Sequence, residues 1–262
     1  MNVQMNPVGT YLREWRQRRR LSQLDFALQA EISQRHLSFM ESGRATPSRD
    51  MLLRLAEHLG VPLRERNTWL LAAGYAPVFQ ERKLDSPALH EARQAIDMLL
   101  KSTEPFPALV VDRGWNLVAA NAAVQPLMAL VADGALLEPP INVMRLSLHP
   151  GGLASRVANL AEWRGHVLDR LFRQITLTND RTLLPLLEEL RGYAAGESQA
   201  PPPPPDHGNV FVPFQLQTER GLLSFFSTAT VFGTAVDITL AELTLESFFP
   251  ANPETAAALR GR

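Results

Sequence analysis

Apolar residues recur at helical spacing through the first third of the chain, in short runs separated by polar residues and glycines. The clearest run places Leu52, Leu55, Ala56 and Leu59 on one helical face, and Gly60 ends it. The pattern predicts a unit of five short helices. They are expected at residues 9–20, in two segments within 22–43, at residues 48–59 and at residues 62–73.

The segment from Ser22 to Gly43 is predicted to form two helices joined by a tight turn. Ser22 and Ser33 suit the two N-cap positions, because a serine hydroxyl accepts a hydrogen bond from a backbone N–H of the first turn. The second helix presents Gln34, Arg35, Ser38 and Phe39 outward. Its amide, guanidinium and hydroxyl groups suit base edges or phosphates in a major groove, although most pairs of short helices only pack a core.

The pattern changes after Leu84–Pro87, where a new helix is expected to run from Ser86 to about residue 104. Residues 109–111 and 115–118 form two β-rich runs around the turn Asp112–Gly114, which predicts a hairpin. Asn121 then suits the N-cap of a further helix.

Further along, residues 142–152 look loop-like, and long helices are expected at 153–175 and 183–193. Five consecutive prolines then predict an exposed loop at residues 197–208, because proline cannot join a helix or a central strand. Apolar residues alternate beyond it, which predicts a three-stranded antiparallel meander. Its strands are expected within residues 210–217, 222–232 and 238–249.

Composition and charge divide the 262 residues in the same place. Residues 1–82 carry 12 Lys and Arg against 8 Asp and Glu, whereas residues 83–262 carry 14 against 19, so only the first part suits a polyanion. The arginines between Arg13 and Arg20 are expected along a phosphate backbone, or else form a solvated face. We predict domains at 1–82 and 105–262, with a connecting helix at 83–104.

The absence of cysteine excludes disulfides and thiolate metal sites. No apolar run approaches the roughly 20 residues of a membrane span, so we expect a cytoplasmic, nucleoid-associated protein without a membrane partner. The common catalytic motifs are missing, and neither His149 nor His166 belongs to an H-E-x-x-H metal motif. We therefore predict no catalytic residues, no bound metal and no cofactor.

The stretches LSQLDFALQAEISQRHLSFMESGR and TPSRDMLLRLAEHLGVP resemble the helix-turn-helix domain of Xre-family, lambda-repressor-like transcriptional regulators. The resemblance implies an all-α five-helix domain that binds a double-stranded DNA operator. It implies phosphate contacts from Gln23 and Arg44, and a recognition helix that begins at Ser33, which is itself a candidate DNA contact. It places base contacts at Gln34, Arg35 and Ser38. Glu31 stands where many members have a turn glycine.

Residues 108–121 resemble the opening of a PAS domain, a sensor fold with a small pocket between a sheet and its helices. Three longer blocks resemble the ligand-binding domain of MmyB-like regulators. They are PFPALVVDRGWNLVAAN, RLSLHPGGLASRVANLAEWRGHVLDRL and FFSTATVFGTAVDITLAELTLESFFPANPETAAAL. The resemblance implies an α+β protein in which a PAS-like α/β domain with an antiparallel sheet follows the helical domain. The small apolar ligand that it implies is a fatty acid or a similar acyl compound.

The pocket of this second domain needs apolar walls, and a ligand carboxylate would need a cation or hydrogen-bond donor nearby. Arg145, His149 and Arg164 are the candidate donors. The candidate walls are Trp115, Trp163, Phe211, Phe214 and Phe226. For each aromatic residue, an ordinary place in the core is the alternative.

Three functions remain open at this point. The first is a homodimeric transcription factor whose DNA binding responds to an acyl ligand. The second is a DNA-binding repressor whose C-terminal domain only dimerises or docks a partner. The third is an enzyme tethered to DNA, which the missing catalytic motifs disfavour.

Overall fold

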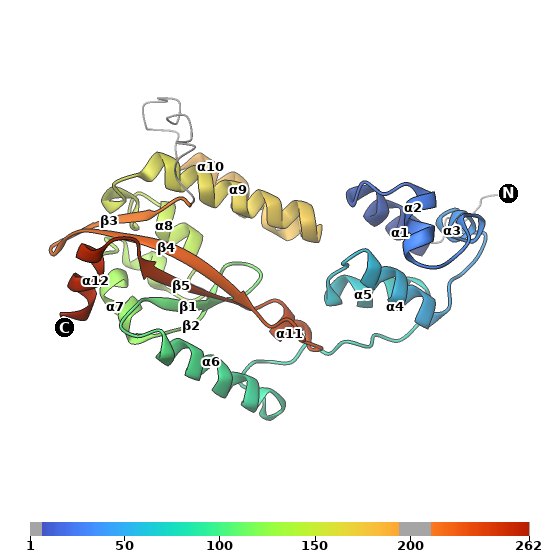
Figure 1. The fold of residues 1–262 in the computed structure, drawn as a ribbon, viewed down its shortest axis with the longest axis horizontal. Helices are drawn as coiled ribbons and strands as arrows, with labels where there is room; N and C mark the ends of the chain where they lie inside the picture. Colours follow the sequence, from blue (N-terminus) through green and yellow to red (C-terminus); the bar gives the residue numbers. More distant parts are fainter. Residues whose placement is uncertain (1–6, 194–210, 262) are drawn as a thin grey trace. The chain divides into compact units, whose positions relative to one another are not determined.

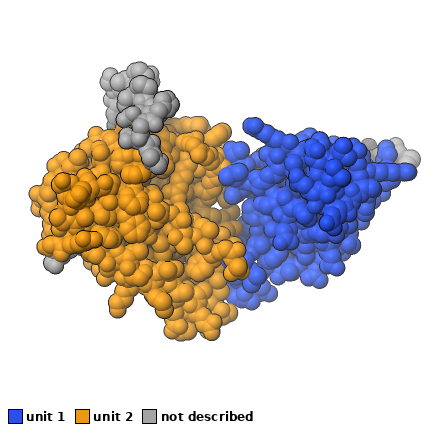
Figure 2. Space-filling model, in the orientation of Figure 1, with its two compact units in different colours: residues 1–82, 176–178, 235–238 blue, residues 83–175, 179–234, 239–262 orange. Residues whose placement is uncertain are grey.

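The computed structural model describes residues 7–193 and 211–261. It divides into two compact units (Figure 2): unit 1 comprises residues 1–82, 176–178 and 235–238, and unit 2 comprises the rest. The proline-rich loop predicted at residues 197–208 lies outside the described residues.

Unit 1 is built from short helices whose starts follow the sequence. The helices are α1 (Pro7–Arg18), α2 (Gln23–Gln29), α3 (Gln34–Glu41), α4 (Arg49–His58) and α5 (Leu63–Ala72). The hydroxyls of Ser22, Ser33 and Ser48 accept the backbone N–H groups three residues later at 3.1–3.3 Å. The predicted N-caps of α2 and α3 are therefore confirmed, and Ser48 caps α4 in the same way.

The turn between α2 and α3 accommodates a residue that is not glycine. Glu31 has φ +54°, in the left-handed region that glycine occupies most cheaply. The next residue, Ile32, donates its backbone N–H to the Ala27 carbonyl at 2.9 Å, which closes the end of α2. Glu31 therefore adopts the glycine-like conformation of this turn without glycine.

An ion pair lies inside unit 1 between the first and third helices. The Arg16 guanidinium donates to both carboxylate oxygens of Glu41, Nε to Oε1 at 2.6 Å and Nη2 to Oε2 at 2.9 Å. Gln23 Nε2 donates to Oε2 at 2.8 Å, and Arg16 Nη1 donates to the Leu21 carbonyl at 2.7 Å. The Glu41 side chain has no exposed area. These bonds join α1, α2 and α3 around one buried carboxylate.

Burial alone would raise the pKa of Glu41, but the hydrogen bonds from Arg16 and Gln23 outweigh it and hold that pKa below its ordinary value. The same bond to Glu41 raises the pKa of Arg16. Glu41 is therefore ionised at neutral pH, and its charge is compensated within the fold.

Unit 2 contains a five-stranded sheet in the order β2-β1-β5-β4-β3, with every neighbouring pair antiparallel (Figure 1). Its strands are β1 (Ala108–Val111), β2 (Leu117–Ala120), β3 (Phe214–Thr218), β4 (Gly221–Val231) and β5 (Thr244–Pro250). The predicted β1–β2 hairpin and the antiparallel order of the last three strands are confirmed. The last strand is shorter than predicted, because residues 238–241 form helix α11.

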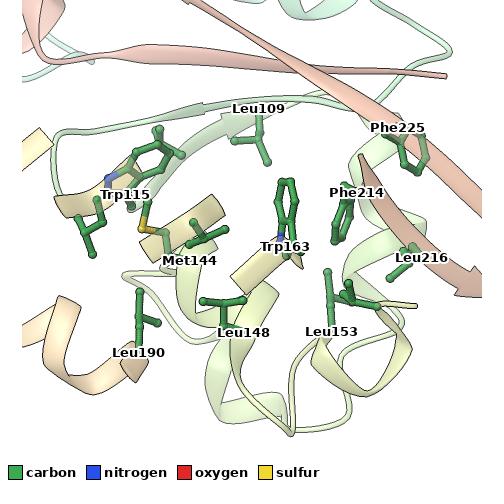
Figure 3. Packing of buried hydrophobic residues seen from close by; sticks show 14 of the residues in the cluster. Leu109, Trp115, Met144, Leu148, Leu153, Trp163, Leu190, Phe214, Leu216 and Phe225 are labelled. Atoms are coloured by element: carbon green, nitrogen blue, oxygen red, sulfur yellow. The ribbon is translucent and has the colours of Figure 1, made fainter. Parts of the chain in front are cut away.

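Helices cover both faces of this sheet. They are η1 (Pro87–Leu89), α6 (His90–Ser102), η2 (Ala122–Val124), α7 (Gln125–Met128), η3 (Gly134–Leu137), α8 (Val143–Leu148), η4 (Ala154–Arg156), α9 (Leu160–Thr178), η5 (Arg181–Leu183), α10 (Leu184–Gly192), α11 (Ile238–Ala241) and α12 (Pro253–Arg260). Alternate residues of β1 serve the two faces: Val110 packs with Ile96 and Leu100 of α6. Leu109 packs with the cluster formed by α8, α9 and α10 (Figure 3).

Two predictions for the middle of unit 2 are wrong. The expected loop at 142–152 contains helix α8, which Asn142 caps by accepting the Arg145 N–H at 3.2 Å. The expected helix at 153–175 begins only at Leu160. Ala158, near the start of the predicted helix, instead lies beside β3 and donates its backbone N–H to the Gln215 carbonyl at 2.9 Å. This tertiary pairing overrides the helical spacing of the apolar residues.

Asn121 occupies the N-cap position of η2, as predicted, but its side chain makes no capping hydrogen bond. Its amide nitrogen donates to the carbonyls of Leu100 and Phe106, and its oxygen accepts the Ala108 N–H at 3.1 Å. The side chain is buried and fastens the end of α6 to the start of β1. Backbone groups that the chain leaves unpaired there are thus satisfied.

We predict that Glu41→Ala destabilises unit 1 by about 3–5 kcal/mol, because it leaves the Arg16 charge buried without its partner. Hydrogen exchange of peptides from α1 to α3 measures the effect. Glu14→Ala, at an exposed position of α1, is the matched control and should change stability by less than about 0.5 kcal/mol. Equal exchange in the two variants would contradict a structural role for the pair.

Candidate functional site

The outer surface of α3 carries the residues proposed to face DNA. Gln34 and Arg35 are exposed in its first turn, and Ser38 is half-buried one turn later. The Arg35 guanidinium lies 5.3 Å from the centre of the Phe39 ring, and the Arg44 guanidinium lies 5.9 Å from the same ring. Phe39 therefore supports two cations on one side of the helix.

Two other predicted contact residues are engaged within unit 1. The Ser33 hydroxyl accepts the His36 N–H, so it caps α3. The Gln23 amide nitrogen bonds to Glu41. An amide nitrogen carries two N–H groups, and one bond to Glu41 uses one of them. Gln23 lies at the first position of α2 and is partly exposed there.

Some of the arginines between Arg13 and Arg20 form hydrogen bonds within unit 1. Arg16 belongs to the buried ion pair, and Arg19 donates from Nε to the Leu59 carbonyl at 2.7 Å while its guanidinium lies over Trp15. Arg13, Arg18 and Arg20 are exposed. The expectation that the whole run follows a phosphate backbone therefore fails for Arg16, whose charge is used inside the unit.

Unit 2 contains a cavity of about 100 Å³ between its sheet and helices α8 and α9. Most of its wall is apolar. The lining residues are Pro107, Leu109, Trp115, Val124, Leu127, Met128, Val131, Val143, Met144, Leu146, Ser147, Leu153, Trp163, His166, Val167, Arg170, Phe214, Phe225, Glu246 and Phe248. Figure 3 shows Trp115, Trp163 and Phe214 around this region. A site of this shape and lining suits a small apolar ligand.

Polar side chains line one part of this cavity. Arg170 of α9 forms an ion pair with Glu246 of β5, and Glu246 is only 6% exposed. Burial raises the pKa of Glu246 despite that ion pair. His166, one turn before Arg170, stacks on Trp163, and burial together with the Arg170 charge lowers its pKa.

Trp115 is held in a strained conformation at the end of the β1–β2 turn. Its φ is +65°, which a bulky side chain rarely adopts. Asp112 Oδ1 accepts the N–H groups of Gly114 and Asn116 at 2.8 and 2.9 Å, which fixes the turn. The indole then donates to Gln174 Oε1 at 2.7 Å and carries the Arg170 guanidinium 4.6 Å above its ring.

Comparison with protein families matches residues 92–261 to the MmyB-like transcription regulator ligand binding domain. Residues 12–66 match a helix-turn-helix domain. The chain belongs to the MmyB-like transcription regulator family. It is a DNA-binding transcription regulator with a ligand-binding domain, and its α+β fold agrees with the prediction from sequence. A comparison with curated proteins finds no match.

The other candidate pocket residues of this MmyB-like regulator lie away from the cavity wall. Arg145 donates from Nε and Nη2 to the two Glu189 oxygens, both at 2.7 Å. The His149 ring packs edge-on against Tyr193, 4.9 Å between centres. Arg164 does not line the cavity. Phe211 and Phe226 pack on each other instead, with ring centres 5.5 Å apart.

Sequence reasoning missed His166, Arg170 and Glu246, the three charged or titratable residues that line the cavity within the described residues. Trp163, His166 and Arg170 recur at spacings of three and four, which places them on one face of α9. Glu246 lies between Leu245 and Ser247 in the buried stretch of β5, where an acidic side chain is unusual. Both signals were present in the sequence.

Within residues 7–193 and 211–261, no group of three or more His, Asp or Glu side chains is arranged to hold a metal ion. No helix in those ranges has the length and apolar character needed to cross a membrane.

We predict that His166 titrates below its ordinary pKa of 6.5, because burial and the Arg170 charge both disfavour the imidazolium. NMR of the imidazole signals during a pH titration measures this, with His166→Gln to assign the peak. Arg170→Gln should move the midpoint upward. A midpoint at or above 6.5 in the unmodified protein would contradict the buried position of the ring.

Proposed function

We propose that this regulator acts as a homodimer whose DNA binding changes when unit 2 takes up a small apolar ligand with an acyl chain, resembling a fatty acid. One observation carries the proposal: an apolar cavity lies inside the domain that matches a ligand-binding family. Such cavities bind ligands mainly by removing apolar surface from water.

The arrangement of unit 2 supports a PAS-like sensor. Its cavity lies between an antiparallel sheet and the helices that cover one face of it. Trp115 and Trp163 supply large flat walls, and Leu109 and Phe225 come from the sheet. We further propose that the protein works in the cytoplasm, at the nucleoid, where its operator DNA lies.

The dimer follows from the number of bases that one recognition helix can contact. A helix of the length of α3 reaches few base edges, so one unit would bind weakly and with little discrimination. In the proposed dimer, two copies of α3 enter successive major grooves about 34 Å apart. A monomer that holds a palindromic operator at monomer stoichiometry would refute this arrangement.

We predict that Arg35→Ala lowers discrimination at one position of each half-site by about 1–3 kcal/mol, because Arg35 is proposed to contact a base edge. Operators selected from a random DNA library provide the sequences, and fluorescence anisotropy measures affinity for each single-base variant. Gln23→Ala is the comparison and should weaken binding to all sequences alike, as expected for a phosphate contact. Equal losses across all variants for Arg35→Ala would remove it from base recognition.

We predict that the purified full-length protein retains an acyl compound, or binds one after addition, because apolar side chains line most of its cavity. Native mass spectrometry measures the added mass. Met144→Trp, which places a larger ring in the cavity wall, should reduce occupancy, whereas Leu28→Trp on the exposed side of α2 should not. A chain that stays empty after lipid addition would favour a domain that only dimerises or docks a partner.

A further inference from the structure

The cavity of unit 2 contains a charged pair in a wall that is otherwise apolar. Glu246 lies on β5, the middle strand, and its register partners are Leu109 on β1 and Ala229 on β4. Paired residues of neighbouring strands point to the same face, so Glu246 points to the same side as Leu109. That side is the one that faces α8 and α9 and lines the cavity.

Arg170 is already engaged on two sides. Its guanidinium forms the ion pair with Glu246 and lies over the Trp115 ring at 4.6 Å. The pair therefore adds no net charge to the cavity. A ligand carboxylate entering beside Arg170 would bring a second negative charge next to Glu246, in a site with little water to screen it.

Trp163 also lines the cavity, and its side chain carries a polar group. Its indole Nε1 is buried and has no hydrogen-bond partner among the described residues. A buried N–H without a partner costs free energy, and an oxygen atom of a ligand would remove that cost. An uncharged oxygen can accept this bond without repulsion from Glu246.

We propose that Glu246 determines the ligand specificity of the cavity: it admits long-chain compounds with an uncharged oxygen head group and opposes free carboxylates. A fatty acid then enters with its proton, and an alcohol or ester of the same chain enters without any change of protonation. This inference rests on the proposed function, because it concerns the head group of the acyl ligand.

Three titratable or charged side chains line the cavity within the described part of the chain: His166 and Arg170 from α9, and Glu246 from β5. The residues contributed by β1, β3, β4, α7 and α8 are uncharged. Arg170 keeps its charge across the neutral range. A change in carboxylate binding between pH 8 and pH 7 therefore reports proton uptake with the ligand, because burial keeps His166 neutral there.

The test compares decanoic acid with decan-1-ol on the full-length protein, by isothermal titration calorimetry. At pH 8 we expect the alcohol to bind at least tenfold more tightly than the acid. Glu246→Gln should raise the affinity for the acid at least tenfold, because Arg170 is then free to pair with the ligand carboxylate. Affinity for the alcohol should stay within threefold. The matched control is Glu242→Gln, which alters an acidic residue that pairs with Arg113 outside the cavity.

A second measurement needs no variant. In the wild-type protein, affinity for the acid should rise several-fold from pH 8 to pH 7, and affinity for the alcohol should not change. Equal binding of acid and alcohol, or discrimination that survives Glu246→Gln, would overturn the role of Glu246 alone. Binding of neither compound by the wild-type protein would overturn the proposed function together with this inference. If Glu246→Gln does not fold, the pH comparison decides.

Discussion

The Glu41 carboxylate is buried at the end of α3, and its charge has to be compensated inside unit 1. Arg16 from α1 and Gln23 from α2 supply that compensation with short hydrogen bonds. A buried carboxylate tolerates little displacement, because each lost bond leaves desolvated charge. The orientation of α3 relative to α1 and α2 therefore depends on this group. The same helix carries Arg35 outward, so a structural ion pair fixes where a proposed DNA contact lies.

The Arg170–Glu246 pair of unit 2 differs from the Arg16–Glu41 pair in the number of hydrogen bonds that its carboxylate receives. Glu41 receives three hydrogen bonds from neighbouring side chains. Glu246 has Arg170 as its ion-pair partner, and burial still raises its pKa, whereas the pKa of Glu41 is lowered. The first arrangement stabilises a fixed geometry. The second leaves a buried carboxylate with one ion-pair partner in the cavity wall, which is an arrangement suited to recognition.

The features that could be predicted from the sequence are those that depend on residues close together in the chain. Serine caps mark the starts of α2, α3 and α4, and the turn after Asp112 marks the β1–β2 hairpin, because each depends on residues a few positions apart. The failures share a different cause. The start of α9 is delayed because Ala158 pairs with Gln215, fifty-seven positions away. The partners of Arg145 and Arg16 were equally hidden, since an ion pair between distant helices leaves no spacing signal.

The family resemblance predicted a pocket in the second domain, and three of the aromatic residues proposed for its walls, Trp115, Trp163 and Phe214, do line the cavity. It did not distinguish Arg145 from Arg170, because both are arginines on helices and only the fold determines which one lies over Trp115. The strained turn that holds Trp115 also places its ring under Arg170, and Arg170 in turn meets Glu246. In the proposed specificity, the head group is set by contacts among the turn before β2, α9 and β5, so the family alone does not determine it.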